Sequence, residues 1–189
     1  MKQQKISVEE ARTFIGTLQE IPNYIEEVLA QAPDIEQLTK RMINANNAFF
    51  IGRGLDYTLC MEGALKLKEI SYIHAEAYAG GELKHGTLAL IEEGVPVIAL
   101  ATQEDVYDKM ISNIREVKAR EAVVIGIGMK GDEELSKHVD HTIYVPRANK
   151  FIAPILAVVP LQLLAYYAAI TRGADVDKPR NLAKSVTVE

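Results

Sequence analysis

The stretch VPVIALATQEDVYDKMISNIREVKAREAVVIGIG, residues 95–128, holds two short apolar runs on either side of a charged segment. The runs, at 95–100 and 122–128, are too uniformly apolar for strands with one face in water, so both faces of each strand should be buried. The segment between them, from Glu104 to Arg120, is long enough for the helix that connects parallel strands. This stretch therefore predicts a strand-helix-strand unit of an α/β sheet.

Two further apolar runs flank this unit, AFFIG at 48–52 and HTIYVP at 141–146. A helix is expected from about Asp56 to Ser71, and a further crossover from Asp132 to Val139. Strands that alternate with helices in this way predict an α/β protein, a three-layer α/β/α sandwich on a parallel, doubly wound sheet. Ligands of such sheets bind beyond the carboxyl ends of the strands.

The first third of the chain has a helical pattern and precedes the sheet as an arm. Ser7 and Glu10 have the spacing of a capping box at the start of a first helix, and Pro22 is expected to divide that helix. Asp34 is expected to cap a second helix that runs to about Ile43. The predicted parts of the chain are a helical arm over 1–46, the α/β domain over 47–173 and a C-terminal tail over 174–189.

The segment from Phe151 to Thr171 is apolar over a length that could span a membrane, with Gln162 as its only strongly polar interior residue. Pro160 lies in its middle, and its flanks carry no clear charge asymmetry. We therefore expect a helix that is buried against the sheet, with Pro154 in its first turn, and no contact with a membrane.

The composition excludes several classes of function. The 189-residue chain has a net charge of -5 and an isoelectric point near 5.5, so it does not have the basic surface of a general nucleic-acid binder. Cys60 is the only cysteine, which excludes an internal disulfide and a zinc cage of several thiols. The N-terminal residues MKQQKISVEEAR have no apolar signal sequence, and a reducing cytoplasm is the expected compartment.

Three charged residues share one edge of the helix expected over 56–71. At about 100° per residue, Glu62, Lys66 and Glu69 fall within an arc of ~60° beside an apolar stripe. A carboxylate at this boundary is partly desolvated, which raises its pKa, while a lysine one turn away lowers it, and such competition can tune a general base. The spacing also suits a simple surface ion pair between Glu62 and Lys66, and spacing alone favours that interpretation.

Two loops that follow predicted strands are possible phosphate sites. Gly52 to Gly54 reads GRG before a helix, where backbone N–H groups and the helix dipole favour an anion. It lacks the third glycine of a dinucleotide fingerprint, so a tight turn is the favoured interpretation. Thr102 and Gln103 follow the next strand, but Glu104 and Asp105 come directly after them and would repel a phosphate. The sequence therefore predicts no phosphate cradle.

Lys84 and His85 form a basic pair between the glycines of GGELKHG. His85 can exchange protons near neutral pH, although an isolated histidine is more often structural or solvated. The other three histidines are scattered, and no metal site is expected. Lys184, in NLAKSV, is an ordinary exposed amine unless the tail folds into a site. There, desolvation would lower its pKa and make it an imine-forming nucleophile.

Four segments together resemble one protein family over essentially the whole chain. They are EGALKLKEISYIHAEAY at 62–78, GELKHG at 81–86, APILAVVPLQLLAYY at 153–167 and DVDKPRNLAKSVTVE at 175–189. The chain resembles the C-terminal part of the glutamine:fructose-6-phosphate amidotransferases, also called glucosamine-6-phosphate synthases. In that family a glutaminase domain delivers ammonia to an isomerase region of two sugar isomerase (SIS) domains. This chain is similar to the second SIS domain with its leading helices, and the resemblance implies no cofactor.

The resemblance also implies roles for five residues. Glu69 matches the base that moves a proton between C1 and C2 of the sugar, and Lys184 matches the lysine that forms an imine with the open-chain sugar. His85 matches a histidine that assists ring opening and reaches the site from the neighbouring subunit, so a homodimer is expected. Lys66 matches a lysine that supports Glu69, and Ala183 matches a tail residue that lines the sugar site.

Two parts of the family's machinery are not found in this sequence. The phosphate-binding, Ser/Thr-rich loop belongs to the first SIS domain, and the cysteine nucleophile belongs to the glutaminase domain. We therefore expect the chain to supply a base, an imine lysine and a histidine to a site that it does not complete, and to be inactive alone. The alternatives are a stand-alone sugar-phosphate-binding or regulatory SIS module, and an assembly element whose catalytic residues are incidental.

Overall fold

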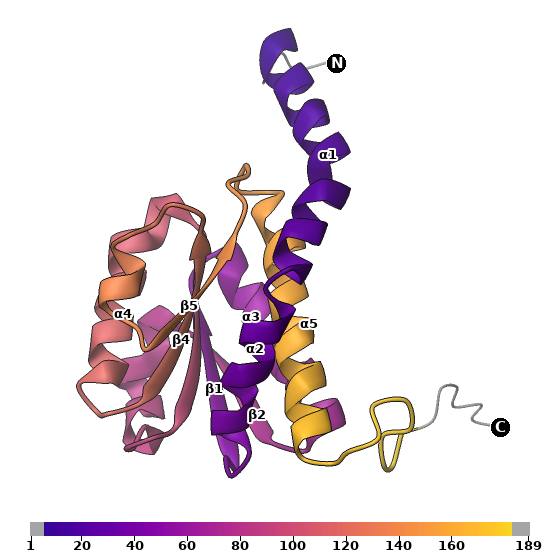
Figure 1. The fold of residues 1–189 in the computed structure, drawn as a ribbon. Helices are drawn as coiled ribbons and strands as arrows, with labels where there is room; N and C mark the ends of the chain where they lie inside the picture. The colour runs from indigo at the N-terminus through magenta and orange to yellow at the C-terminus, as the bar shows by residue number, and fades with distance from the viewer. Residues whose placement is uncertain (1–5, 183–189) are drawn as a thin grey trace, which may run out of the picture.

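A parallel five-stranded sheet forms the centre of the molecule (Figure 1). A computed structural model describes residues 6–182 of the chain. The strand order is β2-β1-β3-β4-β5, and every neighbouring pair is parallel. The strands are β1 (Asn47–Gly52), β2 (His74–Ala79), β3 (Pro96–Ala101), β4 (Val123–Met129) and β5 (His141–Val145). The predicted parallel α/β sheet is confirmed.

Helices cover both faces of the sheet and complete the predicted three layers (Figure 1). α3 (Leu55–Ser71) and α5 (Ala153–Thr171) pack on one face and against each other, whereas α4 (Tyr107–Lys118) packs on the opposite face. In β1, Phe50 belongs to the core beneath α3 and α5, and its neighbour Phe49 belongs to the core beneath α4. Successive side chains of a strand point to opposite faces, so a uniformly apolar strand serves both cores.

Two segments differ in secondary structure from what the sequence predicts. β2 is an additional strand at the edge of the sheet, and its sequence HAEAYA lacks a continuous apolar run because part of the strand is exposed: Ala75 is buried, whereas His74 is exposed. The segment from Asp132 to Val139 was expected to be a crossover helix but contains only a 3₁₀ helix at Leu135–Lys137. The short connection between neighbouring strands leaves room for little more than that turn.

The arm begins with α1 (Val8–Leu29), which extends beyond the sheet (Figure 1). The predicted capping box is present: the Ser7 hydroxyl accepts from the Glu10 N–H at 3.1 Å, and the Glu10 carboxylate accepts from the Ser7 N–H at 2.7 Å. Pro22 lies inside the helix and does not divide it, so that expectation is wrong. A proline removes one hydrogen bond of the ladder, and packing of α1 against α5 supports the helix on which it lies.

α2 (Ala32–Thr39) starts three residues earlier than a helix capped by Asp34 would. Pro33 occupies its first turn, where the missing N–H needs no partner, and Asp34 lies in the same turn with its carboxylate near the positive end of the helix. Asp34 is therefore not the cap. The helix ends at Thr39 and a 3₁₀ helix continues over Lys40–Met42, close to the expected end.

By length and composition α5 could cross a membrane, but half of its most apolar 18-residue window is buried inside the domain. The helix packs against α3 and also contacts α2 and α1, as expected for a helix at the core of an α/β sandwich. Pro154 lies in its first turn as predicted, and Pro160 lies within the helix.

Candidate active site

An open pocket of about 600 Å³ lies between the end of α3 and the start of the C-terminal tail. From α3 it is lined by Lys66, Glu69 and Ile70, and from the tail by Val176, Asp177, Lys178, Pro179 and Leu182. Two of the residues predicted from the sequence, Lys66 and Glu69, therefore face one cavity. The tail forms its other wall.

Lys66 and Glu69 form an ion pair within this pocket. Lys66 Nζ donates to Glu69 Oε2 at 2.7 Å, and the two side chains are 35% and 32% exposed. The hydrogen bond to Glu69 raises the pKa of Lys66; partial burial opposes this, and the charges of Glu69 and Glu62 add to it. Lys66 pairs with Glu69 rather than with Glu62, so the simple surface pair is not the one that forms. A protonated Lys66 holds the Glu69 carboxylate at the pocket wall.

The pocket lies at the edge of the sheet where the strands begin. α3 follows β1 and returns along the sheet, so that its last turn lies near the start of β2, whose first N–H, from His74, donates to the carbonyl of Asn46 at 2.9 Å. Glu69 therefore does not lie at the carboxyl edge, where ligands of such sheets usually bind. The reason is its place near the end of a helix that returns from that edge.

Tyr72 connects the tail to the end of α3. The backbone N–H of Arg180 donates to Tyr72 Oη at 2.9 Å, and the Arg180 guanidinium lies 4.1 Å from the centroid of the tyrosine ring. Closer to α5, the Asp175 carboxylate accepts from the N–H groups of Asp177 and Lys178 at 2.9 and 3.1 Å and shapes a turn. The sequence carries no signal for the contact between Tyr72 and Arg180, because it joins residues that are far apart in the chain.

Two predicted tail residues, Ala183 and Lys184, lie outside the described residues. Leu182, the last described residue, lines the pocket.

His85 lies at the opposite edge of the sheet. It ends the 3₁₀ helix Gly80–His85, which follows the carboxyl end of β2. Its side chain is 72% exposed, and its Nδ1 atom lies 3.2 Å from the Glu82 carboxylate. β2 separates this helix from the end of α3, and a six-residue strand spans about 20 Å. The structure therefore does not bring His85 and Glu69 of one chain together.

The histidine-bearing 3₁₀ helix is held against α4 at two points. Arg53 Nε donates to Asn113 Oδ1 at 2.8 Å, and Gly80 packs so closely on this pair that a Cβ atom there would lie 2.5 Å from the Asn113 oxygen. Lys84 forms an ion pair with Glu116 of α4 at 3.0 Å. The arginine of the GRG turn thus supports a neighbouring segment.

β1 and β3 end side by side where the strand order reverses, which is the usual ligand position in such sheets. Here the buried Asp56 carboxylate accepts from the N–H and the hydroxyl of Thr102 at 2.7 and 2.6 Å. Burial raises the pKa of Asp56, and the hydrogen bonds from Thr102, then Gln103, oppose the rise. A carboxylate in this position takes the N–H that a phosphate would use.

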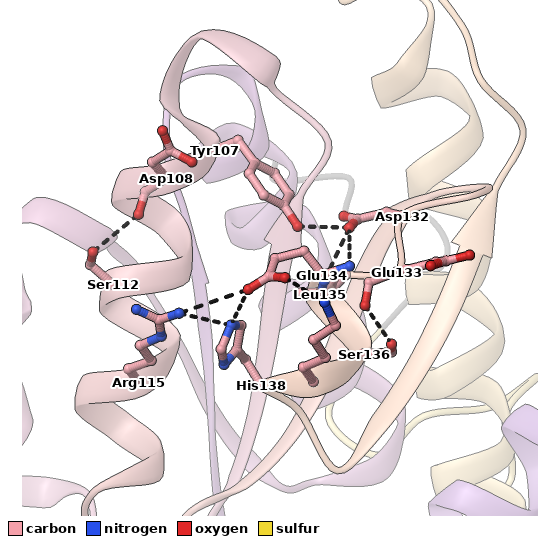
Figure 2. Close-up of polar contacts among 11 residues, drawn as sticks. Tyr107, Asp108, Ser112, Arg115, Asp132, Glu133, Glu134, Leu135, Ser136 and His138 are labelled. Carbon is pink, nitrogen blue, oxygen red and sulfur yellow. Dashed lines mark hydrogen bonds and ion pairs between the residues drawn. The ribbon is translucent and has the colours of Figure 1, made fainter.

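A second pocket, of about 300 Å³, lies at the carboxyl ends of β3 and β4 and is rich in acidic residues. The Tyr107 hydroxyl donates to the Asp132 carboxylate at 2.8 Å, and Asp132 also accepts from two backbone N–H groups of the following turn (Figure 2). Glu134 bonds to Lys137 and His138, which lower its pKa to about 2. These carboxylates make the pocket unfavourable for a sugar phosphate.

Among residues 6–182, no group of three or more His, Cys, Asp or Glu side chains is arranged to hold a metal ion.

Comparisons with known proteins give one consistent result. Residues 41–172 match the SIS domain family. The chain is 54% identical over 185 residues to the glutamine-fructose-6-phosphate aminotransferase (isomerizing) of Symbiobacterium thermophilum, covering 98% of this chain and 30% of that protein. It is 56% identical over 181 residues to the enzyme of the same name from Clostridium acetobutylicum, covering 96% of this chain and 30% of that protein. The chain thus spans less than a third of the length of these curated relatives.

A solved structure agrees with these relatives. The C-terminal domain of glucosamine-fructose-6-phosphate aminotransferase from Francisella tularensis superposes with a TM-score of 0.85 and is 37% identical, covering 92% of this chain and 49% of that chain.

Proposed function

Because the chain belongs to the SIS domain family and corresponds to the C-terminal SIS region of glutamine-fructose-6-phosphate aminotransferases, we propose that it supplies half of a sugar-isomerising active site. The observation that carries this proposal is the pocket in which Lys66 and Glu69 face a tail that continues to Lys184. A carboxylate base on this cavity and a primary amine two residues beyond Leu182 in the sequence suit imine and proton-transfer chemistry at a sugar carbonyl.

In the proposed reaction, His85 of the neighbouring subunit assists opening of the fructose 6-phosphate ring. The free amine of Lys184 attacks the C2 carbonyl, and water leaves as the imine forms. Ammonia from the glutaminase domain then displaces the lysine and restores its amine. Glu69 takes a proton from C1 while the imine nitrogen gains one, and a proton is then returned at C2 while the C1 hydroxyl gives up its own. This gives the aldehyde and amine of glucosamine 6-phosphate without any oxidant or reductant.

The other residues have supporting roles in this proposal. Lys66 orients the Glu69 carboxylate through their 2.7 Å hydrogen bond, and Ala183 lines the sugar site. The first SIS domain holds the phosphate, in keeping with the acidic carboxyl edge of the present sheet and with Asp56 at its switch point. The enzyme is a cytoplasmic homodimer whose partners are its own glutaminase and first SIS domains, with no nucleic acid and no membrane.

The proposal is tested in the full-length aminotransferase that carries this region. Lys184→Arg keeps the positive charge but removes the primary amine, so borohydride should trap no fructose adduct. Glu69→Gln should lower sugar conversion on the order of 10²-fold or more, because general-base catalysis is lost, while glutaminase activity persists. An adduct that still forms in Lys184→Arg, or full conversion by Glu69→Gln, would remove the residue concerned from the mechanism.

The stand-alone binding module is separated from this proposal by calorimetry. We expect the isolated 189-residue chain to show no saturable binding of fructose 6-phosphate, because the phosphate site lies in the first SIS domain. Saturable binding that Lys184→Ala abolishes would instead favour a complete sugar site in this chain.

A further inference from the structure

Tyr72 stands at the junction between the two walls of the candidate pocket. It follows α3 directly and lies three residues after Glu69, and it holds Arg180 of the tail from two sides. Its hydroxyl accepts the Arg180 N–H, while its ring lies against the guanidinium. One side chain thus links the helix that carries the base to the segment that leads to Lys184.

The position of the Tyr72 ring is set by the way in which α3 ends. Tyr72 has a φ of 62°, a left-handed conformation that terminates the helix. On one side, the Ser71 hydroxyl donates to the carbonyl of Leu67 at 2.6 Å and accepts from the N–H of Ile73 at 3.3 Å. Both neighbours of Tyr72 are buried, so the backbone that carries the ring is fixed relative to the last turn of the helix.

We propose that Tyr72 is a positioning residue, which docks the tail so that Lys184 reaches the sugar beside Glu69. This inference rests on the proposed function of Lys184. Only three residues separate Arg180 from Lys184 in the sequence, so a tail that is held at Arg180 gives the amine a smaller volume to search than an undocked tail would. Docking of the tail should therefore speed imine formation, because an amine that is already held near the sugar reacts faster than one that must first diffuse to it.

The structure offers matched variants of this residue. Tyr72→Gly removes the ring and the hydroxyl without backbone strain, because glycine adopts positive φ freely. Tyr72→Phe removes only the acceptor of the Arg180 N–H and keeps the ring. In the full-length enzyme, Tyr72→Gly should lower the rate of borohydride-trappable adduct formation about tenfold, and Tyr72→Phe less, as expected for loss of a cation–π contact and a hydrogen bond.

A purely structural role would not give the same pattern. We expect glutaminase activity, the thermal unfolding temperature and the KM for fructose 6-phosphate to stay near their wild-type values in Tyr72→Gly while kcat falls. Arg180→Ala should reproduce the loss, and the double variant should be no worse than either single variant because both remove one contact. Additive losses, or a raised KM with unchanged kcat, would overturn the positioning role.

Docking itself has a readout that needs no activity. Trypsin cleavage of the 189-residue chain after Arg180, followed by mass spectrometry, should be about tenfold faster in Tyr72→Gly than in the wild type. Equal cleavage and equal adduct formation in the two chains would overturn the inference. Lys184→Arg, assayed in parallel, separates the two proposals: if it still forms the adduct the imine assignment fails, whereas if it alone loses the adduct only the role of Tyr72 fails.

Discussion

Asp140 joins the end of α4 to the starts of β4 and β5. Its carboxylate accepts from Lys118 Nζ at 2.7 and 2.8 Å and from the N–H of Val124 at 2.7 Å. Burial alone would raise the pKa of Asp140, but these hydrogen bonds and the Lys118 charge outweigh it and lower the pKa below 3.8. The ionised form of Asp140 therefore stabilises the folded state.

The sign of the pH dependence follows from this lowered pKa. Asp140 contributes its full stabilisation above its unfolded pKa and loses it as the pH falls through the folded pKa. Asp140→Asn keeps an oxygen for the Val124 N–H but loses the charge. Urea unfolding should show the wild type more stable than Asp140→Asn at neutral pH, with the difference fading between about pH 5 and pH 2. A difference that is constant over this range would contradict the account.

Single residues of the candidate site differ in how far the sequence predicts them. Glu69 and Lys66 share a helix, so helical spacing alone places them on one edge of it, and the structure shows them paired. Tyr72 and Arg180 meet only because α5 returns the chain to the end of α3. No local pattern indicates such a contact, and the sequence shows only that Tyr72 lies near the end of a predicted helix.

At the scale of elements, Gly63 sets how closely α3 can approach its neighbours. A Cβ atom at this position would lie 2.9 Å from Phe50 Cε1 of β1 and 3.1 Å from Leu161 Cδ1 of α5. Glycine to alanine normally stabilises a helix, but Gly63→Ala should destabilise the domain by about 1–2 kcal/mol, because overpacking exceeds the gain in helix propensity.

Gly16 of α1 is the matched control, because a Cβ atom there would meet nothing within 4 Å. Gly16→Ala should stabilise the chain by at most about 1 kcal/mol in the same denaturant titration. If both variants change the stability in the same direction, the close packing of α3 between β1 and α5 does not decide whether a glycine-to-alanine change stabilises or destabilises the chain.

The sequence predicts a strand best where both faces of that strand are buried. β1, β3 and β4 are almost wholly apolar because they are covered on both faces, and the sequence shows them directly; β5 is a partly buried edge strand, but its Ile143 and Val145 still mark it as apolar. β2 is not recognised in the sequence because this edge strand, HAEAYA, contains few large apolar residues. The prediction that Pro22 divides the first helix is wrong because it uses only the local preference of proline. The packing of α1 on α5 is a tertiary contact that the local sequence does not show.

At the scale of the whole molecule, the predicted chemistry is split between two edges of the sheet. The pocket of Glu69 lies at the amino edge, and His85 lies at the carboxyl edge, with the length of β2 between them. One chain cannot join these groups without a rearrangement of the sheet. The proposed site therefore requires His85 from a second copy, related by the two-fold symmetry of a dimer.

The central claim is tested most directly by mixing two inactive full-length variants, Glu69→Gln and His85→Ala. The two variants are unfolded together in equal amounts and then reassembled. Half of the resulting dimers contain one copy of each variant, and each of these mixed dimers has one complete site. We predict recovery of about a quarter of the wild-type sugar conversion, whereas each variant alone stays inactive. If the mixture stays as inactive as its components although mixed dimers form, the histidine acts within its own chain and the account is wrong.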